Sequence, residues 1–97
     1  MITVQNILEW SKPHSIGEGK KTTIETKDLI LSIVGGGKGL YGDFINHFEF
    51  AILDKKTNDF ITKFFFPDNN DDVVGYMEGQ ELIDFLNKIL RSDFQVR

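Results

Sequence analysis

Two stretches of the chain alternate between apolar and other side chains, as strands do when one face of a sheet is buried. In the segment 44–53, Phe48, Phe50 and Ile52 fall on one side, and His47, Glu49 and Ala51 fall on the other. In the segment 24–34, Leu29, Leu31 and Ile33 fall on one side, and Ile30, Ser32 and Val34 fall on the other. Successive strand side chains point to opposite faces, so both segments are predicted to be strands with one apolar face. An apolar sheet face needs a second layer packed on it.

A third strand is predicted over 60–66, the segment FITKFFF. The polar residues 54–59 before it are typical of a hairpin connection, which makes the third strand antiparallel to the second. Pro67 ends the strand, because proline has no N–H for the ladder.

Helices are predicted at both ends of the chain. The segment 79–91 places Leu82, Ile83, Leu86, Ile89 and Leu90 on one stripe, which is the spacing of an amphipathic helix. The segment 3–11 is predicted to be a shorter helix, capped by Thr3 and ended before Pro13.

These elements predict a single α+β domain over residues 1–97. Its core is a three-stranded antiparallel β-meander in the order α-β-β-β-α, with both helices forming a single layer on one face. Phe64 and Phe66 would then point into the core, and Phe65 would join Ile61, Ile30 and Val34 on the open face. Either a partner or the N-terminal helix would cover that face.

Composition excludes several classes of function. The 97 residues contain no Cys, which removes disulfides, thiolate metal sites and cysteine catalysis. Eleven basic residues against fifteen acidic ones give a net charge of −4, which disfavours a nucleic-acid-binding surface. The N-terminus has no basic signal region, and the apolar runs are short, so we expect a soluble, cytoplasmic protein. Ala51 is the only alanine and Lys far outnumbers Arg, which indicates an AT-rich bacterial or phage gene.

The glycine-rich segment 35–43 contains the pattern GxGxxG over Gly37–Gly42. In dinucleotide-binding folds this pattern joins a strand to a helix whose N-terminus holds the pyrophosphate. Here the residues that follow alternate as a strand, and no crossover helix fits before Phe44. We therefore expect no cofactor, and we interpret the segment as a loop between strands that a partner can approach.

The acidic segment 70–81 places Gly75 and Glu81 at the sixth and twelfth positions of an EF-hand loop. Its first position is Asn70, its fifth is Val74, and a predicted strand precedes it instead of a helix. This register offers too few oxygen ligands for calcium. We expect no metal site.

One combination of side chains could support catalysis. His47 and Glu49 share a strand face, and Lys63 on the predicted neighbouring strand would lie beside them. Together they could act as acid, base and phosphate anchor in metal-independent RNA cleavage. On a solvent-facing sheet, such a cluster is more often cross-strand charge pairing. We therefore expect no enzymatic activity and keep a small nuclease as the remote alternative.

The charge distribution is typical either of a face that keeps the protein in solution or of a protein-binding surface. Between Phe64 and Asn87 the chain has six acidic residues and no Lys or Arg. A surface of one sign attracts a partner of the opposite sign. We expect a non-enzymatic protein-binding module, such as an inhibitor, an immunity-type protein or a phage accessory protein, that contacts a basic partner surface. The expected contact residues are Asp68, Asp71, Asp72, Glu78, Lys38, Tyr41 and Phe65. The alternative is a homodimeric structural or accessory protein that associates through the open sheet face.

Overall fold

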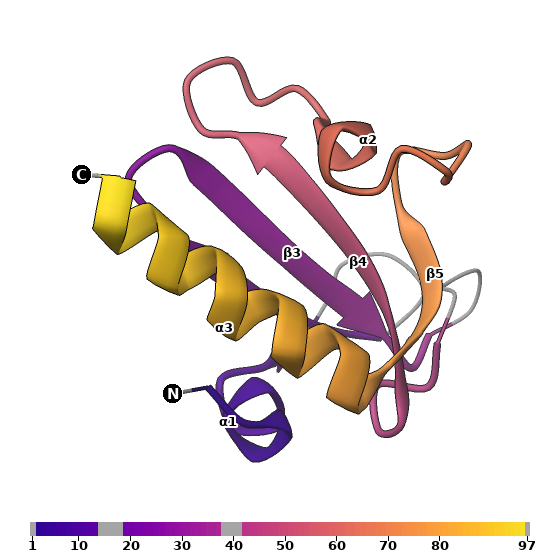
Figure 1. Cartoon of the computed structure of the whole chain (residues 1–97). Helices are drawn as coiled ribbons and strands as arrows, with labels where there is room; N and C mark the ends of the chain where they lie inside the picture. Colours follow the sequence, from indigo (N-terminus) through magenta and orange to yellow (C-terminus); the bar gives the residue numbers. More distant parts are fainter. Residues whose placement is uncertain (1, 14–18, 38–41, 97) are drawn as a thin grey trace.

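The computed structural model describes residues 2–13, 19–37 and 42–96, and it shows an α+β fold (Figure 1). Within these residues, five strands form one antiparallel sheet in the order β1-β2-β3-β4-β5. The strands are β1 (Lys12–Pro13), β2 (Lys20–Glu25), β3 (Leu29–Gly35), β4 (His47–Asp54) and β5 (Val74–Glu78). The helices are α1 (Val4–Glu9), α2 (Thr62–Phe65) and α3 (Gly79–Val96).

The core lies between the sheet and the helices α1 and α3, which pack side by side on the same face (Figure 1). The predicted apolar faces are confirmed, because Leu31 and Ile33 of β3 and Phe48, Phe50 and Ile52 of β4 are completely buried. The predicted stripe of α3 is confirmed too. Leu82, Ile83 and Leu86 are buried, and Ile89 and Leu90 pack against the core at its margin. Ile7 of α1 closes this core from the side.

The start of α1 follows from its sequence. The Asn6 N–H donates to Thr3 Oγ1 at 3.2 Å, and the Thr3 N–H donates to Asn6 Oδ1 at 3.1 Å. This reciprocal capping confirms the predicted cap, since it satisfies backbone donors that have no partner inside the helix. The helix ends at Glu9, two residues before the predicted end, with Trp10 as its C-cap.

The prediction of three strands is wrong, and the first reason is a turn inside the segment 24–34. Thr26 donates its N–H to the Leu29 carbonyl at 2.9 Å, and the Leu29 N–H donates to Thr26 Oγ1 at 3.0 Å. These bonds close a tight turn over Thr26, Lys27 and Asp28. A threonine side chain can bond to nearby backbone in this way and so compete with the strand conformation. The segment therefore contributes to two paired strands, β2 and β3, in place of one.

The second reason is that the segment 60–66 is not a strand. It forms a single bridge, Leu53 to Phe60, and then turns into α2. The Ile61 N–H donates to the Ile52 carbonyl at 2.8 Å, and the Ile52 N–H donates to Thr62 Oγ1 at 3.0 Å. Both backbone groups of Ile52 are thus satisfied without a further strand on the side of β4 that faces away from β3. Phe64, predicted to point inward, is 84% exposed, whereas Phe66 is half-buried.

The remaining edge of β4 is covered by β5, which lies in the acidic segment 70–81, where no strand was predicted. Phe48 pairs with Met77, and Phe50 pairs with Val74, so β5 has one residue more than β4 over this interval. This is a β-bulge, and Tyr76 within it has a φ of 53°. Glycine at 75 is typical of turns, which is why the sequence did not indicate a strand here. The left-handed backbone at Tyr76 is likewise more common in turns than in strands.

The face opposite the helices carries Ile30, Ser32 and Val34 of β3 beside Leu53 and Ala51 of β4, in register. Neither Phe65 nor Ile61 belongs to it, which corrects the predicted open face. On this face, Val34 and Ala51 are only 6% and 5% exposed. This face therefore presents less accessible apolar area than the alternating pattern predicted.

Candidate functional site

The predicted contact residue Phe65 lies on α2, and the side chain of Thr62 fixes that short helix to the sheet. Thr62 is buried, and its hydroxyl accepts the Ile52 N–H and donates to the Asp72 carbonyl at 2.6 Å. One hydroxyl therefore joins β4, α2 and the loop that precedes β5. Because the helix has only four residues, this anchoring and its aromatic packing must hold it in place.

An aromatic cluster packs α2 against α3. The ring of Phe85 on α3 lies 4.8 Å from Phe66, 5.6 Å from Phe50 and 6.1 Å from Phe65, measured between centroids. The contacts with Phe50 and Phe65 are edge-to-face, an arrangement that aromatic pairs favour. Phe65 contributes to this cluster and is still 37% exposed. It thus lies on the helix side of the molecule, held by Phe85.

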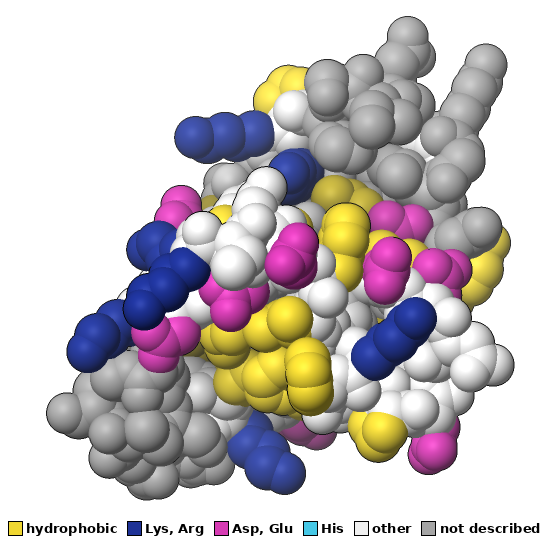
Figure 2. All heavy atoms as spheres, turned by 90° about the horizontal axis from the view of Figure 1, so that it is seen from above, with side chains coloured by type: hydrophobic (Ala, Val, Ile, Leu, Met, Phe, Trp, Pro, Cys, Tyr) yellow, Lys and Arg dark blue, Asp and Glu magenta, His cyan; other side chains and the backbone are white. Residues whose placement is uncertain are grey.

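A shallow hollow of about 440 Å³ opens beside this cluster. Its lining residues are Phe65, Phe66, Pro67, Asp68, Asn69 and Val74. Two of the predicted contact residues, Phe65 and Asp68, therefore line one depression. α2 lies at the top of the molecule in Figure 1, and Figure 2 looks down on that end, where hydrophobic side chains form a patch bordered by acidic and basic ones.

The acidic residues next to the hollow lie on a loop that is held by Asn69. Its Nδ2 donates to the carbonyls of Asp71 and Val73 at 2.9 and 2.8 Å. Asp71 Oδ1 accepts the N–H of Asp72, and Asp72 forms an ion pair with Lys63 at 4.0 Å. Both charged side chains of that pair are 58% exposed, so it contributes little to stability. Asp68 lines the hollow, and the exposed Asp71 and Asp72 follow it on the same loop; we call these three residues the acidic rim.

Sequence reasoning missed the role of Asn69. Its side chain orders the loop between α2 and β5, and it also lines the hollow. Asparagine commonly bonds to backbone one turn away, so the segment Asp68-Asn69-Asn70 was a local signal for such a loop. Phe85, which holds Phe65, was hidden because it lies at the margin of the predicted stripe of the last helix.

Glu78 does not belong to the hollow. It ends β5, where it lies opposite His47 of β4 in register. The other predicted contact residues, Lys38 and Tyr41, fall outside the described residues.

The described ends of the glycine-rich loop are tightly built. Gly36 donates its N–H to the Gly42 carbonyl at 2.9 Å, and Gly42 has a φ of 147°. A Cβ at Gly42 would lie 2.6 Å from the His47 carbonyl oxygen, so only glycine fits there. The segment therefore needs glycine for the close approach of two backbones.

Asp43 follows this loop and holds the start of β4. Its Oδ1 accepts the N–H groups of Ile45, Asn46 and His47 at 2.9, 2.9 and 3.0 Å. These backbone bonds, that of His47 first, lower the pKa of Asp43 from 3.8 to about 2. Three donors on one oxygen stabilise the charged form even in an exposed group. Asp43 is thus an anchoring residue that the sequence analysis did not single out.

The residues considered for catalysis are not arranged as predicted. His47 and Glu49 share one face of β4, but the residue opposite His47 is Glu78 of β5. Lys63 lies on α2, and its carboxylate partner is Asp72. The predicted position of Lys63 on a strand beside His47 is therefore wrong.

Three further observations concern metal binding and the membrane. Among the residues that the structure describes, no three His, Asp or Glu side chains gather in a way that could hold a metal ion. The segment with a partial EF-hand pattern contains β5, which replaces the loop that calcium would need. Over residues 2–13, 19–37 and 42–96, no helix is long and apolar enough to cross a membrane.

The chain was compared with known proteins through its sequence and its fold. No family model, no curated protein and no solved structure matches it.

Proposed function

We propose that this chain is a non-enzymatic protein-binding module, and that its contact surface is the hollow at α2 together with the acidic rim of Asp68, Asp71 and Asp72. The observation that carries the proposal is the position of Phe65. It is a partly exposed aromatic side chain that is held by Phe85 and lies beside Asp68 in the hollow. A rigid aromatic anchor next to charged groups is the usual composition of a binding hot spot.

A second aromatic residue supports the proposal. Phe64 is 84% exposed on the same helix, next to Phe65. Exposing a phenylalanine to water has a free-energy cost of about 2 kcal/mol relative to burying it. Adjacent exposed aromatic residues therefore indicate a surface that becomes covered on binding.

The charge of the rim indicates the chemistry of the partner. Three carboxylates lie within the five residues 68–72, and the nearby lysine of α2, Lys63, is already paired with Asp72. The whole chain carries a net charge of −4. The partner surface is accordingly basic at the rim and apolar where it meets Phe64 and Phe65. Blocking a basic, nucleic-acid-handling protein is a role that such a surface would serve.

The test uses a matched pair of charge-reversal variants. Asp68 and Asp71 are changed to Lys in one variant, and Glu9 and Asp59 are changed to Lys in the other, so both gain the same charge. The probe is a fluorescently labelled peptide that alternates Lys and Leu, followed by anisotropy. The proposal predicts that only the first variant loses affinity, by about tenfold or more. Equal losses in the two variants would mean that general charge attraction binds the peptide, and the proposal would be wrong.

A further inference from the structure

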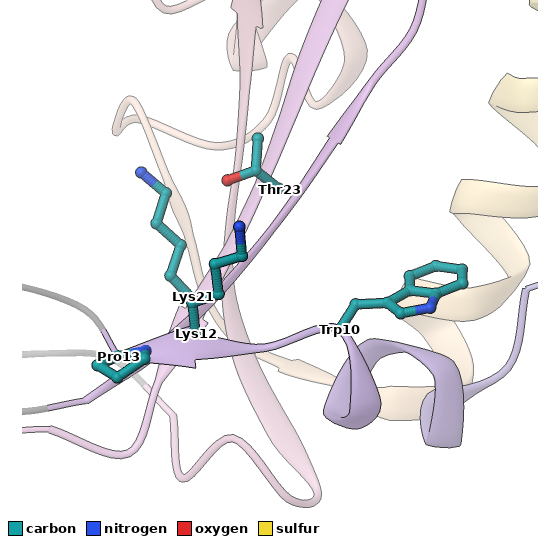
Figure 3. Close-up of a pocket in the computed structure, with 5 residues that line it drawn as sticks. All are labelled: Trp10, Lys12, Pro13, Lys21 and Thr23. Atoms are coloured by element: carbon teal, nitrogen blue, oxygen red, sulfur yellow. The ribbon is translucent and has the colours of Figure 1, made fainter.

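A second hollow, of about 320 Å³, lies at the opposite edge of the sheet from β5, where β1 diverges from β2 (Figure 3). It is lined by Trp10, Lys12, Pro13, Lys21 and Thr23. Figure 3 shows the Lys12, Lys21 and Thr23 side chains extending to the same side of the two strands, while the indole of Trp10 extends away beside α1. This hollow has the opposite charge to the α2 surface.

The two lysines form an unusual pair. Lys12 and Lys21 lie directly opposite each other in the register of β1 and β2. Like charges at this position repel each other and destabilise the sheet. Within the described part of the chain, the ion pairs join Lys55 to Glu25 and Lys63 to Asp72, and neither lysine of the hollow takes part in one. The hollow thus has positive charge that an anionic ligand could compensate.

Beside the hollow, β2 has an open backbone edge. The Thr26 N–H points toward β3, because it donates to the Leu29 carbonyl. Backbone groups alternate in direction along a strand, so those of Thr23 and Glu25 point away from β3, toward the outer edge. In the described residues, β1 covers β2 only at Lys20 and Lys21. The N–H and C=O groups of Thr23 and Glu25 are therefore available to a further strand.

We propose that an extended acidic segment of another protein adds a strand to the edge of β2 at Thr23 and Glu25, with a carboxylate side chain beside Lys12 and Lys21. Main-chain bonds along the edge provide affinity, and the side chains that line the hollow select the sequence. Trp10, which is 48% exposed, lines the hollow at the end of this edge next to α1. This surface is separate from the one at α2, so either proposal can fail without the other.

A peptide fits these observations better than a nucleic acid. Single-stranded nucleic acid would also place phosphates near lysines and a base near an indole. Its sugar-phosphate backbone has no amide groups, however, and could not pair as a strand with the backbone of Thr23 and Glu25. The net charge of −4 opposes a long polyanion but allows a short acidic segment to bind locally.

Trp10 is the only tryptophan, so its fluorescence reports on the hollow in the unmodified protein. The probe is a short peptide, blocked at both ends, that alternates Glu and Val. We expect a saturable change in Trp10 emission with this peptide, and no change with the matching peptide of Lys and Val. Methylation of alternate peptide amides should weaken binding by about tenfold, because it removes main-chain donors. Equal binding of the methylated peptide, or stronger binding of an oligothymidylate, would overturn the proposal.

Two variants test the same surface from the protein side. K12E combined with K21E should abolish the emission change, whereas K27E combined with K56E has the same change of charge away from the hollow and should retain it. Thr23→Pro removes one edge donor and should weaken binding by about tenfold. If Thr23→Pro fails to fold, the methylated peptide decides the same point. If the variant with K12E and K21E still binds the peptide of Glu and Val, the proposal is wrong.

Discussion

Asn87 of α3 and Ile2 before α1 are joined by two hydrogen bonds, although 85 positions separate them in the sequence. The Ile2 N–H donates to Asn87 Oδ1 at 2.8 Å, and Asn87 Nδ2 donates to the Ile2 carbonyl at 3.0 Å. The side-chain amide thus pairs with the backbone as a neighbouring strand would. It attaches the N-terminal segment to α3 and fixes where α1 closes the core.

This relationship predicts the effect of Asn87→Ala. The substitution leaves two part-buried backbone groups of Ile2 without their partner, which should lower the free energy of unfolding by about 1–2 kcal/mol. Urea unfolding followed by circular dichroism measures the loss. Asn70→Ala, at an exposed position, is the control and should leave stability unchanged. An equal effect of both substitutions would contradict this account.

The carboxylate of Asp43 predicts a dependence of stability on pH. Its folded pKa of about 2 lies below the ordinary value of 3.8, so the folded state favours the charged form. The resulting stabilisation is fully present above pH 3.8 and is lost as the pH falls toward 2. The difference in unfolding free energy between the wild-type protein and Asp43→Asn should therefore be constant at higher pH and shrink over this range. Urea titrations across the range measure it, and a constant difference throughout would disprove the role of Asp43.

Close backbone contact at Gly42 predicts a rank order of two glycine substitutions. A Cβ at Gly42 meets the His47 carbonyl at 2.6 Å, whereas the nearest atom to a Cβ at Gly36 is 3.3 Å away. Both positions have positive φ, so both substitutions to Ala are strained. Gly42→Ala should lower stability by about 2 kcal/mol or more, and Gly36→Ala by less. Thermal or urea unfolding of the two variants gives the order, and the reverse order would show that the loop closes differently.

The short helix α2 predicts different effects for two neighbouring phenylalanines. Phe66 packs between Phe50 and Phe85, so Phe66→Ala should cost about 2 kcal/mol of stability. Phe64 is almost fully exposed, so Phe64→Ser should change stability by less than about 0.5 kcal/mol. Urea unfolding distinguishes the two. If the segment were the strand that its sequence predicts, both substitutions would destabilise the protein strongly.

Much of the fold was predictable because its patterns are long and local. The alternation around Phe48, Phe50 and Ile52 and the stripe through Leu82 and Leu86 each define one buried face, and both are confirmed. The cap at Thr3 depends on residues three positions apart, so it too was visible in the sequence.

The error over the segment 60–66 arose because tertiary contacts decided its structure. Phe64 to Phe66 favour a strand locally, but Thr62 satisfies Ile52 from a helical turn and Phe85 packs against Phe65 and Phe66. Both contacts join segments distant in sequence, so no local pattern predicts them.

The candidate site was predictable as a composition but not as a geometry. The acidic residues and an exposed Phe65 were expected from the sequence. Their meeting in one hollow depends on Asn69, which orders the loop, and on Phe85, which holds the aromatic ring. Glu78 belongs to the same acidic segment but lies at the end of β5, because the bulge and the strand carry it away from the hollow.

The most direct test of the central claim is an amide NMR spectrum of the unmodified protein during titration with the peptide of Lys and Leu. The account predicts that the signals of α2 and of residues 67–74 shift in proportion to saturation, and that those of β1 and β2 stay in place. Shifts spread evenly over the acidic surface, or centred on another part of the chain, would contradict a binding site at Phe65 and Asp68.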